Sequence, residues 1–289
     1  MSSLLGLGGN IPSAAAAGFY THQIANSCRF DVGSSSNLSL ASASTSGNND
    51  YWTFSFWWKS NPISTDQTFL GAGDGTGNSD NYLELRLRTT TDNTIRSAST
   101  DANVFTTTAM FRDPSAWSHG LWNNNNGTST FYINGTQVAT GSLDGGAGSA
   151  INSKDMTIGK YTLGTSQYYG GYLAEVMMVS ADSSAAVLTP TSFTETKNGV
   201  FIPKDISGLS NQDFYLKFEN SADLGNDSSG NNRDWTSNGL AAEDQMLDSP
   251  TFDSDTNGGN FATLNPLVAI SGVTFSEGNL KEADDNSGW

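Results

Sequence analysis

Carboxylates are the residues through which this chain could do acid–base chemistry, since its 29 Asp and Glu side chains far outnumber its two histidines and one cysteine. Hydrolysis of a glycosidic bond needs two carboxyl groups about 5–10 Å apart. Alternating acids on one strand would supply such a pair, but Glu84 and Glu175 each lack an acidic neighbour on their strand face. Asp253 and Asp255 have the spacing, but they lie in an Asp/Asn/Gly-rich loop. The sequence therefore predicts no catalytic residue and no enzyme activity.

The two histidines and the cysteine do not form a recognisable reactive site. No C-x-x-C pair accompanies His22, His119 and Cys28, so a zinc site of the usual type is excluded. A Ser-His-Asp hydrolase would need a G-x-S-x-G elbow, which is absent. His119 follows Trp117 in an expected strand, where we predict a structural, half-buried histidine. The single Cys28 excludes an internal disulfide.

Oxygen-rich loops are the candidate cation sites, because calcium prefers several Asp, Asn and backbone carbonyl ligands on turns. Suitable residue types occur in the loop of residues 71–80 and again at 223–231. Neither loop has the D-x-[DN]-x-[DN]-G spacing, and such loops are usually only turns. Calcium is the one ion for which there are candidates, and no other cofactor is predicted. The candidate ligands are Asp74, Asn78 and Asp80, with a second set at Asp223, Asp227 and Asn231.

Aromatic side chains next to amides are candidates for contact with a glycan. Trp122 precedes Asn123–Asn126, and Tyr168 and Tyr169 form a pair. The alternative is that these rings are structural, as we expect for the tryptophans in the strands, which suit the core of a sandwich. Trp122, Tyr168 and Tyr169 are therefore the candidate glycan contacts.

Short strands must position these residues. Residues 82–88 (YLELRLR) place Leu83, Leu85 and Leu87 on one face and polar side chains on the other, as in an antiparallel strand with one solvated face. Asn134-Gly135 inside residues 131–139 indicates a hairpin. Further strands are expected at 51–59, 156–159, 171–180 and 213–218, with turn clusters at 71–80, 123–128 and 141–149. Helical signals are limited to 183–188 and 191–199, the latter with Gly199 as a C-cap.

Many short strands with almost no helix predict an all-β fold, an antiparallel β-sandwich or jelly roll. The dense strand region covers 28–200 and follows a Gly/Ala-rich lead at 1–27. Residues 201–267 read as an acidic, loop-rich extension, and 268–289 as the start of a further β domain or a linker.

Net charge excludes several classes of partner. The formal charge is −16 at pH 7, and 15 of the 29 acidic residues follow residue 200. Phosphate backbones would be repelled, so nucleic acid is not an expected partner. No run of 18 apolar residues occurs, which argues against membrane insertion. No Lys or Arg precedes Arg29, and Gly and Pro interrupt the lead, so no signal peptide is predicted.

An ordered set of motifs carries a family resemblance. The chain resembles the laminin-G-like, concanavalin A-like jelly-roll family over about residues 29–182. The motifs, in order, are RFD (29–31), NLSL (37–40), WTFSFW (52–57), FRDPSAWSH (111–119), YING (132–135), TIG (157–159) and GYLAEV (171–176). Many domains of this family bind calcium at a loop edge.

The segment that follows extends the resemblance. Residues 212–267, with DSSGNNRDW (227–235) and NFATLNPL (260–267), are similar to a module that follows this jelly roll in tailed-bacteriophage structural proteins. The resemblance implies a virion protein, such as a tail fibre, spike or appendage subunit that supports host attachment. Such a protein is made in the host cytoplasm and needs no signal peptide.

The resemblance to phage structural proteins implies a role for the lead and a role for the sandwich. Leu4, Leu5, Leu7 and Ile11 cannot form a core of their own, so the lead is either a disordered end or an anchor to other virion proteins of the tail or near the portal. Appendages of this kind imply a homo-oligomer, with a trimer favoured, and a host surface glycan as a further partner. The alternatives are a calcium-dependent lectin-like module, a capsid-attached fibre or decoration protein, and a polysaccharide depolymerase.

Overall fold

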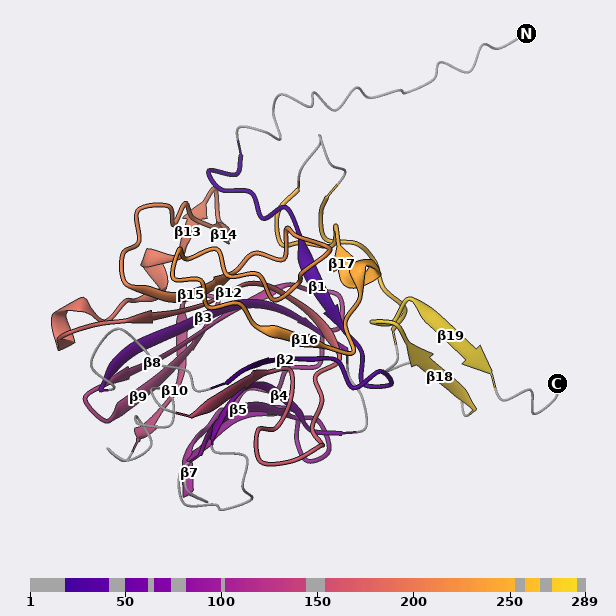
Figure 1. The fold of residues 1–289 in the computed structure, drawn as a ribbon, viewed down its shortest axis with the longest axis horizontal. Helices are drawn as coiled ribbons and strands as arrows, with labels where there is room; N and C mark the ends of the chain where they lie inside the picture. Colours follow the sequence, from indigo (N-terminus) through magenta and orange to yellow (C-terminus); the bar gives the residue numbers. More distant parts are fainter. Residues whose placement is uncertain are drawn as a thin grey trace, which may run out of the picture.

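Period-two alternation of apolar side chains builds two antiparallel sheets that pack face to face (Figure 1). This computed structural model describes residues 19–41, 50–61, 65–73, 82–99, 102–143, 154–252, 258–265 and 272–284. The all-β jelly-roll expectation is confirmed. The described residues include no helix long and apolar enough to cross a membrane.

The first sheet, here sheet I, has the strand order β10-β9-β8-β3-β12-β1-β17, with β15 also paired to β12. Its central strands β3 and β12 are the longest and are buried along almost their whole length. The bounds are β1 Ser27–Phe30, β3 Tyr51–Ser60, β8 Ser118–Asn125, β9 Thr128–Ile133, β10 Thr136–Ser142, β12 Gly171–Ser180, β15 Gln212–Leu216 and β17 Gln245–Met246.

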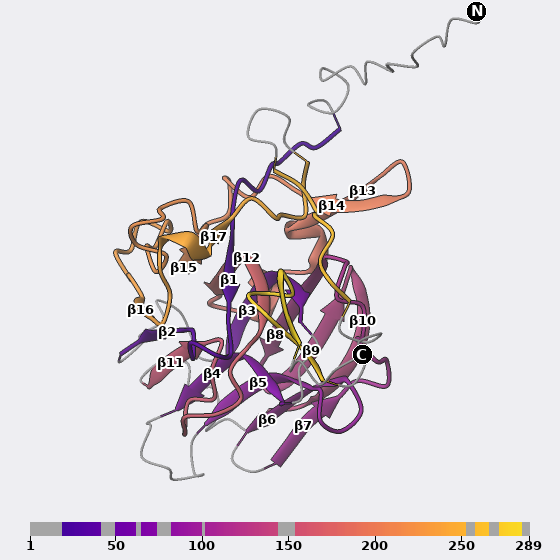
Figure 2. The same ribbon diagram turned by 90° about the vertical axis from the view of Figure 1, so that its right-hand side faces the viewer.

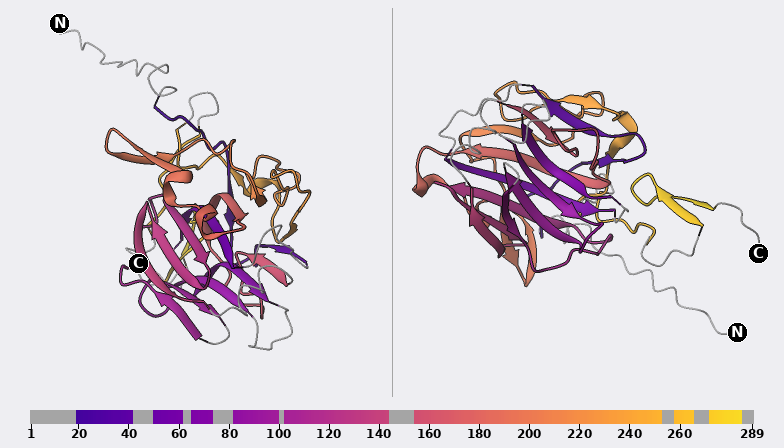
Figure 3. Two further views of the ribbon diagram at one scale, coloured as in Figure 1. Left: turned by 90° about the vertical axis from the view of Figure 1, so that its left-hand side faces the viewer. Right: turned by 90° about the horizontal axis from the view of Figure 1, so that it is seen from below.

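The second sheet, sheet II, has the order β16-β2-β11-β4-β5-β6-β7 and is viewed from below in the right panel of Figure 3. Leu83, Leu85 and Leu87 point into the core as predicted, but Glu84 on the opposite face is only 2% exposed. The bounds are β2 Asn37–Leu40, β4 Gln67–Gly73, β5 Leu83–Arg88, β6 Thr94–Ser99, β7 Ala102–Thr106, β11 Asp155–Ile158 and β16 Thr236–Asn238.

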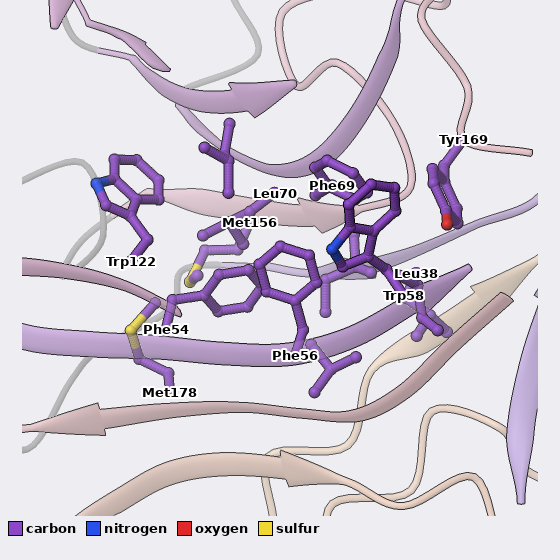
Figure 4. Packing of buried hydrophobic residues seen from close by; sticks show 14 of the residues in the cluster. Leu38, Phe54, Phe56, Trp58, Phe69, Leu70, Trp122, Met156, Tyr169 and Met178 are labelled. Atoms are coloured by element: carbon purple, nitrogen blue, oxygen red, sulfur yellow. The ribbon is translucent and has the colours of Figure 1, made fainter. Parts of the chain in front are cut away.

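Aromatic rings fill the space between the sheets (Figure 4). Phe54, Phe56 and Trp58 alternate along β3 and all face inward. Phe56 packs on Gly120 of β8, where a Cβ atom would lie 2.6 Å from the ring. The glycine therefore makes room for the ring, and the sandwich depends on large side chains matched to small ones.

Part of the outer face of sheet I, around β12, is covered rather than solvated. Met177 and Val179 of β12 pack beneath Phe193 and Ile206. The covering segment contains the short 3-10 helices η1 Ser184–Ala186 and η2 Pro190–Ser192, then the hairpin β13 Thr194–Lys197 and β14 Val200–Pro203, which projects from the sandwich in Figure 2. A helix over 191–199 was therefore a wrong prediction. Asn198 and Gly199 have φ angles of 53° and 81°, as a tight hairpin turn requires, so Gly199 is not a C-cap.

Residues 201–267 contribute strands to both sheets. β15 pairs with Val176–Val179 of β12, whereas β1 pairs with Leu173–Gly171 of the same strand. The two therefore lie end to end along one edge of β12, with a bulge at Glu175, whose φ is 44°. β16 joins sheet II beside β2, and η3 Ala242–Asp244 leads into β17. The segment expected to be a loop-rich extension is thus in part an integral piece of the sandwich.

Within 268–289 the structure describes one hairpin, β18 Val273–Ser276 and β19 Lys281–Asp284. Glu277 lies 2.8 Å from the guanidinium of Arg29, and Tyr172 donates a hydrogen bond to the carbonyl of Gly278. The hairpin is thereby attached to sheet I through β1 and β12.

Candidate functional site

A polar groove of about 560 Å³ lies on the outer face of sheet I, over β8 and β9. Strand residues form its floor, and the segment carrying η1 forms one wall. That wall is fixed to the sheet, because the Leu188 amide donates to Thr53 Oγ1 and Asn123 Nδ2 donates to the Leu188 carbonyl. Its lining residues are Tyr51, Asn123, Asn125, Asn126, Thr128, Thr130, Tyr132, Ser184, Val187 and Thr189.

Strand alternation explains why these side chains gather. Asn123 and Asn125 of β8 lie opposite Thr130 and Thr128 of β9, and Asn125 also lies opposite Tyr51 of β3. Residues opposite each other in register share a face of the sheet, so they form two cross-strand rows. Residues 123–128 were expected to be a turn cluster, but β8 continues to Asn125 and the turn is confined to Asn126-Gly127. Four successive asparagines follow Trp122, so the sequence offers no alternation of apolar and polar residues that could have revealed this.

The polar atoms in the groove are available to a ligand. Within the described part of the chain, the side chains of Asn125, Thr128, Thr130 and Tyr132 make no hydrogen bond. Asn125, Thr130 and Tyr132 are only partly exposed, so they are held by packing rather than by hydrogen bonds. None of the described residues that line the groove is charged. The arrangement suits a neutral ligand that carries hydroxyl groups and has an apolar face to lie on a tyrosine ring.

Two of the three predicted glycan contacts are core residues. Trp122 is fully buried and donates from Nε1 to Ser129 Oγ at 2.6 Å, and Tyr169 is fully buried with its hydroxyl 3.0 Å from the Lys59 carbonyl (Figure 4). Neither presents surface to a ligand, because both rings pack between the sheets. Tyr168 is half-buried and does not line the groove. The neighbours of Trp122, rather than Trp122 itself, face outward.

The structure describes the second set of calcium candidates but neither the first set nor the anchor candidates. Asp74, Asn78 and Asp80, like Leu4, Leu5, Leu7 and Ile11, lie outside the described residues. In the second set, the carboxylate of Asp227 accepts hydrogen bonds from the amides of Tyr215, Ser229 and Arg233 and from the Ser229 hydroxyl. Asp227 thus organises the DSSGNNRDW loop. The described residues contain no group of three His, Cys, Asp or Glu side chains suited to a metal ion.

A second cluster joins residues that the sequence separates. Glu175, at the bulge of β12, accepts from the Tyr215 hydroxyl at 2.6 Å and lies 2.5 Å from Nε2 of His22. Burial opposes the charged form of His22, but the hydrogen bond and charge of Glu175, with Asp205, prevail and raise its pKa above 6.5. Burial, together with Glu175, also raises the pKa of Tyr215. A tyrosine held protonated in this way is a poor nucleophile. The role of the cluster is structural, because its hydrogen bonds hold His22, in the segment that leads into β1, against β12 and β15.

This cluster borders a cleft of about 610 Å³ between the covering segment and β15. Its charged groups are engaged within the protein. His22 pairs with Glu175, the Asp205 carboxylate accepts the Ser207 amide, and Lys217 lies 3.8 Å from Glu219. The groove over β8 and β9 therefore offers more unpaired polar atoms for recognition.

His119 is a buried structural residue. It is 1% exposed, so more deeply buried than predicted, and its Nε2 lies 2.9 Å from Ser55 Oγ. Its Nδ1 has no hydrogen-bond partner among the described residues. Complete burial lowers the pKa of His119 from 6.5 to about 3, so the ring is neutral at pH 7.

The fold defines a class of protein, a two-sheet jelly roll, and this one carries a polar groove on the outer face of sheet I. A laminin-G-type family model, described as the concanavalin A-like lectin/glucanases superfamily, matches residues 32–188. The chain belongs to this superfamily, as its sequence motifs indicated. No curated protein matches the chain.

Solved structures resemble it in fold. A candidate carbohydrate-binding protein from Bacteroides ovatus is 16% identical, with a TM-score of 0.50, over 75% of this chain and 59% of its own. Domain 4 of a Geobacillus stearothermophilus arabinanase, solved with arabinotriose, is 17% identical over 48% and 65%, with a TM-score of 0.38. A Ruminococcus gnavus sialidase module, solved with sialyllactose, is 14% identical over 52% and 84%, with a TM-score of 0.35. At these identities the similarity concerns the fold alone.

Proposed function

We propose that the β-sandwich is a glycan-binding module and that the groove over β8 and β9 receives the sugar. The observation that carries this proposal is the pair of cross-strand rows beside Tyr51 and Tyr132, in which the Asn125 amide and the hydroxyls of Thr128 and Thr130 make no hydrogen bond among the described residues. Sugars present hydroxyls that pair with such groups and C–H faces that pack on aromatic rings. Membership of a superfamily that includes lectins supports the same reading.

The module binds its glycan without cleaving it. None of the described residues that line the groove carries a carboxylate, whereas glycoside hydrolysis needs a pair. The buried carboxylate of Glu175 lies in another part of sheet I and is occupied by His22 and Tyr215. We therefore favour a binding protein over a depolymerase.

The first test is a glycan array probed with the full chain and with Tyr132→Ala. We expect Tyr132→Ala to weaken binding about tenfold, because losing one ring face removes roughly 1–2 kcal/mol of contact. Tyr168→Ala is the matched control, since Tyr168 is also half-buried but lies outside the groove. Loss of binding in Tyr168→Ala with none in Tyr132→Ala would place the site elsewhere. Binding lost in EDTA would support the calcium-dependent alternative.

We propose further that the module belongs to a bacteriophage virion protein, a tail fibre, spike or appendage subunit or a capsid-attached fibre. The support is the sequence similarity of DSSGNNRDW and NFATLNPL to phage structural proteins. In this role residues 1–27 join the subunit to other virion proteins, copies associate as a homo-oligomer, trimers being favoured, and the groove meets the host surface.

Immunogold labelling of purified virions tests this context. We expect antibodies against the sandwich to label particles at their appendages, because the protein would be built in during assembly. Label on the capsid surface would select the fibre or decoration role on the head. Particles that stay unlabelled, while the lysate contains the free protein, would contradict the virion assignment.

A further inference from the structure

Lys59 is a buried lysine whose amine meets two side chains that could react with it. It projects from the outer face of β3 and its side chain is 0% exposed. Its Nζ lies 2.8 Å from Asp248 Oδ2, 2.9 Å from Asn260 Oδ1 and 2.5 Å from the Phe261 carbonyl oxygen. Asp248 and Asn260 are 189 and 201 residues away in sequence, so only the fold brings the three together.

The surroundings keep water away from the amine. Trp117 donates from Nε1 to the other oxygen of Asp248 at 2.8 Å, which orients the carboxylate. The ring of Tyr172 lies 5.7 Å from Nζ, and Asp248 is 3% exposed. The charges of a lysine and a carboxylate interact strongly in a site from which water is excluded. No bulk water contacts Nζ, so a proton that leaves the amine passes to Asp248 rather than to solvent.

From this geometry we propose that Lys59 and Asn260 form an intramolecular isopeptide bond, with Asp248 moving the protons. Asp248 first takes a proton from the Lys59 ammonium across their 2.8 Å contact, which leaves a neutral amine. The Nζ lone pair attacks Cγ of Asn260, and the N–C bond forms as the carbonyl electrons move to Oδ1.

Collapse of this tetrahedral intermediate breaks the bond between Cγ and Nδ2. Asp248 gives its proton to Nδ2, and Nζ gives one of its two protons to the same nitrogen. Nδ2 therefore leaves as ammonium. One ammonium ion leaves per bond formed and Asp248 ends as a carboxylate, so charge and atoms balance. No oxidant, metal or cofactor takes part.

Two features favour the reaction over a simple hydrogen bond. Groups held at contact distance react as if at very high concentration, with effective molarities of about 10⁵–10⁸ M in well-oriented cases. Asn260 is exposed although Lys59 is buried, so the leaving group has a route to solvent. The product would tie β3 covalently to the segment after β17, a useful property in a protein exposed outside cells.

Intact mass spectrometry of the purified full chain tests the proposal. We expect the folded chain to be lighter than its sequence mass by one ammonia molecule, and a tryptic digest to contain a peptide pair joined through Lys59 and Asn260. Asn260→Ala, an exposed position, should fold and show its full sequence mass. Lys59→Arg keeps the charge but should also show no loss.

The opposite results are equally clear. A folded wild-type chain at its full sequence mass, with no joined peptides, would overturn the proposal. Loss of one water molecule instead, with the joined peptide at Asp248, would overturn the assignment of Asn260 as the electrophile. In Asp248→Asn, with folding verified by near-UV circular dichroism, the ammonia loss should disappear; its persistence would overturn the proton-transfer role of Asp248.

Discussion

Trp122→Ala is expected to lower the free energy of unfolding by about 3–5 kcal/mol, the range for removing a fully buried large aromatic side chain. Trp122 makes an edge contact with Trp52 at 4.9 Å between ring centroids and another with Phe105 at 6.1 Å. The substitution leaves a cavity between the sheets and removes the partner of the Ser129 hydroxyl. Denaturant unfolding monitored by fluorescence gives the change directly.

Trp122→Phe is the matched control, because it keeps a ring in the core and loses only part of the volume. We expect it to cost less than half as much. A small stability change in Trp122→Ala with a large loss of glycan binding would contradict the placement of this residue, since it would show that the ring meets the ligand.

Acidification should destabilise the protein through His119. A histidine whose folded pKa of about 3 lies below its unfolded value of 6.5 takes up its proton first in the unfolded chain. Its contribution to stability is therefore complete above pH 6.5 and is lost as the pH falls toward 3. The expected slope is about 1.4 kcal/mol per pH unit, or roughly 2–3 kcal/mol between pH 6 and pH 4.

Urea unfolding at several pH values measures the contribution of His119 to the free energy of unfolding. The contribution is the difference in that free energy between wild type and His119→Gln. Glutamine keeps a group able to bond Ser55 but does not titrate. The variant should be the less acid-sensitive of the two, because the carboxylates shared by both chains cancel in the comparison. Parallel stability curves from pH 6 to pH 4 would show that His119 accepts a proton freely in the fold.

Local pattern was enough to predict the strands. In residues 82–88 and 171–180 the residue types alone predict a strand. Asn134-Gly135 predicts its turn because both residues readily adopt a positive φ, which is 47° and 78° in the structure. The prediction of a helix at residues 191–199 was wrong because the local residue types there do not specify one element. Polar Thr, Glu and Lys fit either a helix or an exposed hairpin, and contact with sheet I decided between them.

The sites depend on long-range pairing that no local pattern contains. The Asn123–Asn126 run reads as a turn by composition, yet pairing with β3 on one side and β9 on the other keeps most of it in a strand. Glu175 meets His22 across 153 residues, and Lys59 meets Asn260 across 201. His22 and Asn260 lie outside the strands of sheet I, so only the tertiary fold around the sheet brings these groups together.

Amide hydrogen–deuterium exchange with and without the strongest glycan from the array tests the central claim most directly. The groove assignment predicts slower exchange in β8, β9 and residues 184–189 when glycan is bound, with the rest of the described chain unchanged. Protection at the cleft beside His22 and β15, or on the outer face of sheet II, would contradict it.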